Sequence, residues 1–155
     1  NKALIRDGEK FTLKSLKVDG VLLNESQYSL SKEALTIADV PDSFSLEIQT
    51  CLQPHLNTEL SGLFQSSGNF CTQCEPEGFR RITYFPDRTD ILSVHDVTIT
   101  SDKSACPVLM SNGNPGAKGD NGDGIHWAKW LEPHTKPCYL FAFAAGVLKH
   151  ISDQN

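Results

Sequence analysis

The stretch CTQCEPEGFRRITYFPDRTD, residues 71–90, narrows the fold and the function of this chain more than any other part. It is too polar and too irregular for an ordinary core segment. Gln73 and Glu75 stand two positions apart, so in an extended chain their side chains point to the same side. Pro76 biases Glu75 away from helix and toward extended geometry. One amide and one carboxylate can therefore converge on a small cation such as a free amine.

Strand patterns surround this stretch on both sides. Phe44, Leu46 and Ile48 alternate with polar residues, as in a half-buried strand. The dipeptide at residues 19–20, Asp-Gly, stands between two apolar runs and predicts a hairpin turn. Further short strands are expected at residues 11–18, 21–23, 35–40, 91–100, 108–111, 125–131 and 139–148.

The pattern of elements predicts an all-β fold. No long segment keeps a helical period, and one short helical turn is expected at residues 79–85. Residues 114–124 are rich in Gly and Asp and are expected to form a loop. About eight to ten short strands with frequent turns indicate an antiparallel β-sandwich or a pair of strongly curved sheets. The length of 155 residues favours a single domain over residues 1–155.

The composition excludes several classes of protein. With 14 basic and 19 acidic residues the net charge is -5, which argues against a nucleic-acid partner. The longest apolar run, residues 140–148, is too short to cross a bilayer, so no membrane partner is expected. The five cysteines are odd in number and irregularly spaced, which indicates reduced thiols. Together with the lack of a signal peptide, this predicts a cytoplasmic protein.

Two motifs hint at metal binding, and both have simpler explanations. Cys71-x-x-Cys74 is half of a zinc motif, but no second pair completes it. It also lacks the helix that a thioredoxin-like redox site requires, so two small semi-buried side chains are the favoured interpretation. Residues 120–124, DNGDG, suggest calcium, but Gly occupies ligand positions and no closing Glu follows. A hairpin loop is the favoured interpretation there.

A second hypothesis treats the chain as a free-standing β-sandwich that binds a ligand or a protein. Trp127 and Trp130 lie on one expected strand and on its opposite faces, so one is expected in the core and the other at a neighbouring surface. These residues or the Gly-rich loop would then form the binding surface.

Glu77 continues the side on which Gln73 and Glu75 lie, and it could hold a cation equally well.

From residue 57 onward the sequence resembles the N-terminal domain of bacterial aminopeptidase N, a zinc-dependent alanyl aminopeptidase of the gluzincin family. The segments that carry this resemblance are long and consistently spaced, and a weaker similarity continues back to about Phe11. They are NTELSGLFQSSGNFCTQCEPEGFRRITYFPDRTD at 57–90, LMSNGN at 109–114, HW at 126–127 and KPCYLFAFAAG at 136–146.

The resemblance implies a β-rich, saddle-shaped unit that packs over a thermolysin-like catalytic domain of the same polypeptide. In that family the matching loop supplies a Gln and a Glu that hold the free α-amine of a peptide substrate. These positions correspond here to Gln73 and Glu75. The parent enzyme would be a metalloprotease, a hydrolase that removes N-terminal amino acids from peptides.

The chain departs from the family pattern in its metal site. None of its five histidines is followed by Glu, so the His-Glu-x-x-His zinc motif is missing. The Gly-Ala-Met-Glu-Asn substrate motif is missing too, since the only methionine is Met110. Both ends look cut. We therefore expect a fragment that contributes substrate recognition, binds no cofactor and is inactive alone, with the zinc ligands elsewhere in the parent enzyme.

Overall fold

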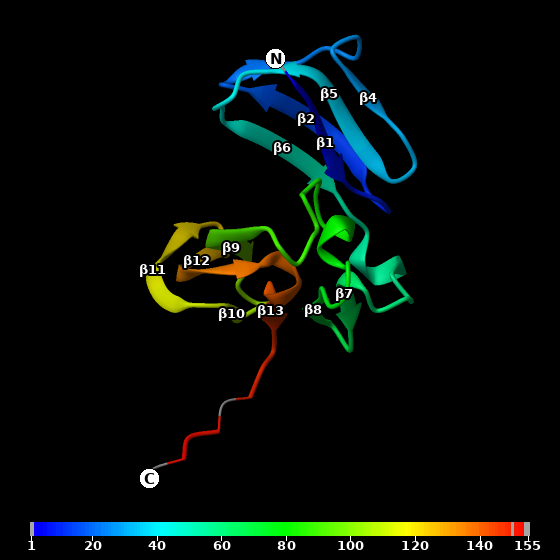
Figure 1. Cartoon of the computed structure of the whole chain (residues 1–155). Coiled ribbons are helices and arrows are strands. Elements are labelled where there is room, and N and C mark those ends of the chain that lie inside the picture. Colours follow the sequence, from blue (N-terminus) through cyan, green and yellow to red (C-terminus); the bar gives the residue numbers. More distant parts are fainter. Residues whose placement is uncertain (1, 150, 154–155) are drawn as a thin grey trace.

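The chain is built from strands and short 3-10 turns. Its structure is a computed structural model that describes residues 2–149 and 151–153 (Figure 1). The strands are β1 Lys2–Asp7, β2 Thr12–Val18, β3 Val21–Leu22, β4 Tyr28–Leu30, β5 Ala34–Val40, β6 Leu46–Cys51, β7 Gly62–Ser66, β8 Asn69–Gln73, β9 Leu92–Asp102, β10 Val108–Ser111, β11 Asn114–Gly122, β12 Ile125–Pro137 and β13 Phe143–Gly146. The turns are η1 Pro54–Leu56, η2 Phe79–Arg81 and η3 Cys138–Leu140. In the described part of the chain, no helix has the length and apolarity that crossing a membrane requires.

The first six strands form two facing antiparallel sheets, drawn in blue to cyan in Figure 1. The strand orders are β1-β5-β4 and β3-β2-β6. The predicted hairpin is present: Asp19 and Gly20 have φ of 50° and 78°, the positive values that a type I′ turn requires. Leu16 of β2 and Leu35 of β5 are almost fully buried between the sheets. Alternating apolar side chains from both sheets thus make the first core.

The remaining strands form a second pair of antiparallel sheets, of orders β10-β13-β8-β7 and β11-β12-β9. They pack through Cys106, Leu109 and Ala145, which lie against Ile99 of β9 and Ala128 of β12. Strand β9 alternates exposed and half-buried residues along its whole length, as one solvated face requires. The prediction of an all-β, antiparallel sandwich is confirmed.

The segment between β8 and β9 joins the two pairs of sheets. Phe85 and Asp7 exchange two backbone hydrogen bonds, each of 3.0 Å, which attach the segment to β1. Tyr84 enters the first core, while Phe79 enters a separate cluster with Cys74 and Cys138. The predicted helical turn is present as η2. This junction carries the residues that the sequence singled out.

Three expectations about the strands need correction. The described residues hold thirteen strands, and β1, β4, β7, β8 and β11 were not expected. Most of the segment expected as a loop at residues 114–124 is β11, and only the turn after Gly122 leaves it. Gly119 pairs with Trp127, whose indole Nε1 would lie 2.8 Å from any Cβ at that position. Glycine there makes room for a ring within a strand. In the expected strand 139–148, only Phe143–Gly146 is extended in a sheet.

Candidate functional site

Gln73 and Glu75 lie at the point where β8 ends and the junction segment begins. Both are exposed, and Gln73 pairs with Gly62 of β7 as the last residue of its strand. The Gln73 side-chain amide donates a hydrogen bond of 3.0 Å from Nε2 to the backbone carbonyl of Glu75. Its carbonyl oxygen is thereby left to accept a further bond. The Glu75–Pro76 peptide bond is cis.

The structure separates Glu75 from Glu77, which the sequence left as equal candidates. Glu77 has a φ of 58° and pairs with Arg80, with 3.4 Å between Oε1 and the guanidinium. The Glu75 carboxylate makes no hydrogen bond or ion pair within residues 2–149 and 151–153. Its negative charge is therefore available to a ligand, whereas that of Glu77 is already partly compensated.

Glu75 faces a hollow of about 620 Å³. Three chain segments line it: Glu75, Pro76 and Glu77, then Asp87, Arg88, Thr89 and Asp90, and finally Tyr139. Arg88 and Asp90 form a bidentate pair, with hydrogen bonds of 2.9 and 2.6 Å. Asp87 is paired with Arg80. Among the four carboxylates of the lining, only that of Glu75 has no cationic partner in the described part of the chain. The hollow therefore has one uncompensated negative charge, which could bind one cation.

One of the carboxylates that line this hollow, that of Asp87, is buried. The Asp87 side chain is 3% exposed, and its Oδ2 accepts hydrogen bonds from Arg80 Nε at 3.0 Å and from the Arg80 backbone N–H at 3.1 Å. The Cys138 thiol donates to the other oxygen, Oδ1, at 2.9 Å. Buried charges require such compensation, and Asp87 has it from two directions.

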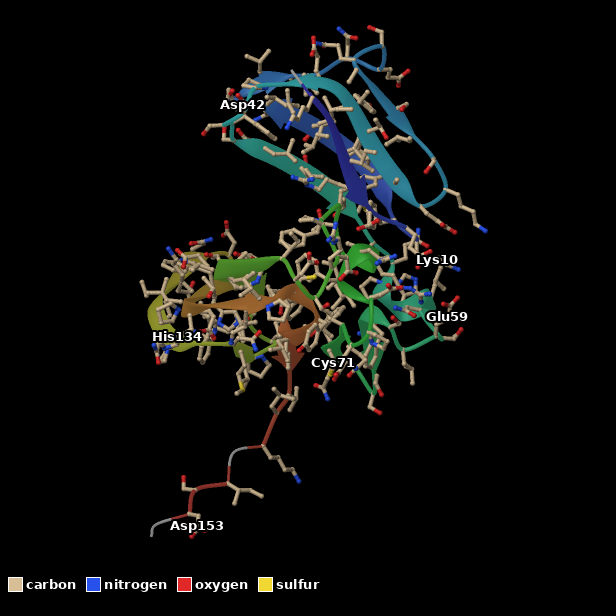
Figure 2. The ribbon with its side chains drawn as sticks, in the orientation of Figure 1. Lys10, Asp42, Glu59, Cys71, His134 and Asp153 are labelled. Atoms are coloured by element: carbon tan, nitrogen blue, oxygen red, sulfur yellow. The ribbon has the colours of Figure 1, made fainter. Side chains whose placement is uncertain are left out.

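The two cysteines of Cys71-x-x-Cys74 do not act together. Cys71 lies half-buried on the lower sheets, where Figure 2 labels it, and Cys74 is buried in the cluster with Phe79. Burial, helped by the Asp87 charge, raises the pKa of the Cys74 thiol to about 12. All five thiols are free. Within the described residues, no three His, Cys, Asp or Glu side chains come together in a way that could hold a metal ion.

The tryptophans and the Gly-rich segment are used by the fold. Trp127 lies over Gly119, and Trp130 Nε1 donates to the Leu109 carbonyl at 3.1 Å. Asp120, in the segment that suggested calcium, accepts hydrogen bonds from the Gly122 N–H and from Lys103. The predicted hairpin turn is confirmed there, between β11 and β12. These contacts account for the residues on which the binding-module hypothesis depended.

A second hollow, of about 570 Å³, lies at the other side of the junction. Its charged lining is Lys10, Lys14 and Arg81 against a single acid, Glu59. Lys10 and Arg81 both bind Glu59, and Figure 2 shows Lys10 and Glu59 at the same edge of the molecule. Three cations around one paired carboxylate would repel an ammonium group, so this hollow does not suit an amine.

Sequence reasoning missed Arg80, Asp87 and Tyr139. The stretch at residues 86–90, PDRTD, resembles an exposed polar loop, and only the folded chain buries Asp87 in the wall of the hollow. Tyr139 was assigned to a strand but lies in η3. The sequence holds only a weak indication of these residues. It consists of a short segment, residues 76–86, that has a proline at each end and two adjacent arginines inside it.

Comparison with known proteins confirms the resemblance. The family described as Peptidase M1 N-terminal domain matches residues 5–140. Aminopeptidase N of Caulobacter vibrioides is 47% identical over 154 residues, covering 99% of this chain and 18% of that protein. Aminopeptidase N of Escherichia coli is 46% identical over 134 residues, covering 84% of this chain and 15% of that protein. The chain thus spans less than a fifth of these relatives.

Solved structures agree. Legionella pneumophila aminopeptidase A, in complex with aspartic acid, gives a TM-score of 0.92 at 39% identity, over 96% of this chain and 18% of that chain. An M1 zinc metallopeptidase from Deinococcus radiodurans gives 0.79 at 14% identity, over 94% of this chain and 34% of that one, which shows the shared fold. On the strength of the family match, the chain belongs to the Peptidase M1 N-terminal domain family.

Proposed function

We propose that this chain is the substrate-recognition part of a zinc-dependent aminopeptidase, and that Glu75 and Gln73 hold the free α-amine of a peptide. The observation that carries the proposal is the unpaired Glu75 carboxylate, in a hollow where every other carboxylate has a cationic partner. The names of the relatives, aminopeptidase N and aminopeptidase A, support the reaction class.

The chemistry of an α-amine suits these two side chains. Its pKa is about 7.7–8.0, so much of it is protonated at neutral pH. The Glu75 carboxylate would accept a charge-assisted hydrogen bond from the ammonium group. The Gln73 carbonyl oxygen, oriented by the bond from Nε2 to the Glu75 carbonyl, would accept a second. Internal peptide bonds carry no such charge, so only chain ends would be held.

Holding the amine also fixes the distance from the chain end to the bond that is cut. Such positioning lowers the barrier because the reacting groups no longer have to find one another. The described residues of this chain do not form a zinc site, so the metal would be bound by other parts of the parent polypeptide.

The test is Glu75→Gln in the full-length protein that carries this chain. The variant keeps the size of the side chain and removes its charge, so kcat/KM for aminoacyl substrates should fall roughly ten- to a hundredfold, which corresponds to about 1.5–3 kcal/mol. Glu77→Gln is the matched control. It makes the same chemical change two positions away, and it should lose far less because Glu77 already pairs with Arg80. Equal losses in both variants, or no loss in Glu75→Gln, would refute the assignment.

We further propose that the protein works in the cytoplasm. Support comes from the five cysteines, which are all free and of which Cys74, Cys106 and Cys138 are buried. Disulfides persist in oxidising compartments, whereas free thiols suit a reducing one. Cell fractionation should place the native protein with soluble cytoplasmic markers, and recovery with periplasmic or extracellular markers would contradict the proposal.

A further inference from the structure

The hollow in front of Glu75 is made by three separate segments of the chain. Residues 75–77 form one wall, residues 87–90 form the second, and Tyr139 forms the third. No two of these walls belong to the same strand or turn. The shape of the hollow therefore depends on whatever bonds connect the three segments to one another.

One carboxylate makes those connections. Asp87 belongs to the second wall, and its Oδ2 accepts from the backbone and the guanidinium of Arg80. The same guanidinium donates to the Asp87 carbonyl at 3.1 Å and reaches Glu77 of the first wall at 3.4 Å. Oδ1 accepts from the thiol of Cys138, the residue next to Tyr139 in the third wall.

The environment of Asp87 makes these bonds matter. Its side chain is 3% exposed, so water cannot replace a partner that is lost. Burial and the nearby Asp87 keep the Cys138 thiol protonated, with its pKa raised to about 12, so it remains a donor at any physiological pH. The Asp87 backbone N–H also donates to Asp7 at 3.1 Å, which attaches the same residue to β1.

We propose that Asp87 is a positioning residue for substrate recognition: by joining the three walls, it sets the place at which the Glu75 carboxylate meets the amine of the substrate. Asp87 does not touch the substrate itself. Arg80 and Cys138 are its two partners in this role. The inference depends on the proposed function of Glu75, and the experiment below separates the failure of one from the failure of the other.

The experiment is a double-mutant cycle of Asp87→Asn and Glu75→Gln in the full-length protein, measured as kcat/KM on an aminoacyl substrate. Asp87→Asn keeps the shape of the side chain and removes its charge. The resulting shift of the Glu75 carboxylate should lower kcat/KM roughly ten- to a hundredfold, mostly through a higher KM. If Asp87 acts through Glu75, the same change should have little further effect in the Glu75→Gln background.

Glu132→Gln is the matched control for a loss of stability. Its side chain is also buried, 8% exposed, and pairs with a cation, Lys136, but it does not line the hollow. Both variants should lower the melting temperature, whereas only Asp87→Asn should raise KM. If Asp87 had only a structural role, Asp87→Asn and Glu132→Gln would change KM and the melting temperature alike. The losses of kcat/KM caused by Asp87→Asn and Glu75→Gln would then multiply in the double variant.

Each outcome decides something. An effect of Glu75→Gln without an effect of Asp87→Asn, or effects that multiply in the double variant, overturns the role of Asp87 alone. No effect of Glu75→Gln overturns the proposed function and this inference together. If Asp87→Asn does not fold, Cys138→Ala and Cys138→Ser test whether the bonds to Asp87 position the Glu75 carboxylate. Alanine removes the donor to Oδ1 and should raise KM severalfold, serine restores a donor and should recover binding, and equal behaviour of the two would overturn the proposal.

Discussion

Gly78 allows the loop that carries Glu75, residues 73–78, to fold back against itself. Gly78→Ala should therefore displace the Glu75 carboxylate. Its φ of -87° and ψ of -18° are open to any residue, so the constraint on this position is space. A Cβ there would lie 2.5 Å from the Gln73 carbonyl oxygen and 2.8 Å from the Cys74 Cα. Both are backbone atoms, which cannot rotate away as the end of a side chain could.

The size of the displacement follows from these distances. Restoring an ordinary contact of about 3.4 Å requires the Gln73 carbonyl to retreat by roughly 1 Å. Overpacking of this kind destabilises a protein by about 1–3 kcal/mol. A shift of about 1 Å in a positioning group can lower the rate roughly a hundredfold. The loss of kcat/KM should therefore be large compared with the loss of stability.

The assay compares Gly78→Ala with Gly116→Ala in the full-length protein. Gly116 lies in β11, its φ is outside the left-handed region, and its added Cβ would meet the Lys129 carbonyl at 3.1 Å. An ordinary contact there requires a shift of only a few tenths of an ångström. The thermal stabilities of both variants and their kcat/KM on one aminoacyl substrate are measured together. If Gly78→Ala changes kcat/KM no more than Gly116→Ala, the link between loop geometry and amine binding is wrong.

Three further predictions concern the rest of the molecule. Leu35→Ala removes a side chain that is 0% exposed, so urea unfolding of the 155-residue chain should show a loss of about 2–5 kcal/mol, and a loss below 1 kcal/mol would contradict the assigned core. Burial and, to a lesser extent, the Lys136 charge lower the pKa of His95, so the folded state disfavours the imidazolium form. The free energy of unfolding should therefore fall as the pH drops below about 6.5. His95→Phe should weaken this pH dependence. Exposed Cys51 should react with iodoacetamide at pH 8, whereas Cys74 and Cys138, whose pKa values burial raises to about 12, should stay unmodified until the protein unfolds.

Local patterns in the sequence predicted the elements that local physics decides. Asp19-Gly20 gave the hairpin because few residue pairs tolerate positive φ twice in succession. The alternation at Leu46 and Ile48 gave β6 because one of its faces is packed and the other is wet. The turn after Gly78 was also predicted correctly.

Elements that depend on distant partners were missed. In β11 the glycines suggested a loop, but Gly119 is small because the Trp127 ring of the next strand covers it. Strands β7 and β8 are short and pair with each other, and β8 also pairs with β13. No local window contains the pairing of Cys71 with Ala144 across β8 and β13. The turn between β7 and β8 is local, because Ser67 and Gly68 repeat the two positive φ values of Asp19 and Gly20, and this signal was overlooked.

The candidate site shows the same division. The spacing of Gln73 and Glu75 predicted two side chains on one side of an extended chain, but Glu75 lies in a turn. The Gln73 side chain bonds the backbone carbonyl of Glu75, and the convergence of the two side chains on one amine stays a prediction. The choice between Glu75 and Glu77 was open in the sequence, because it depends on which one Arg80 pairs with. The importance of Asp87 was invisible, since its partner Cys138 lies 51 residues away. That residues 1–155 make up one domain stays a prediction.

The central claim is that the charge of Glu75 binds the charge of the substrate amine, and one measurement tests it most directly. The inhibition constants of a free amino acid inhibitor and of its des-amino analogue are compared in the wild-type full-length protein and in Glu75→Gln. The amine should strengthen binding markedly in the wild type and contribute little in the variant, so that the ratio of the two constants falls toward one. If Glu75→Gln weakens both inhibitors equally and the ratio is unchanged, Glu75 does not recognise the amine.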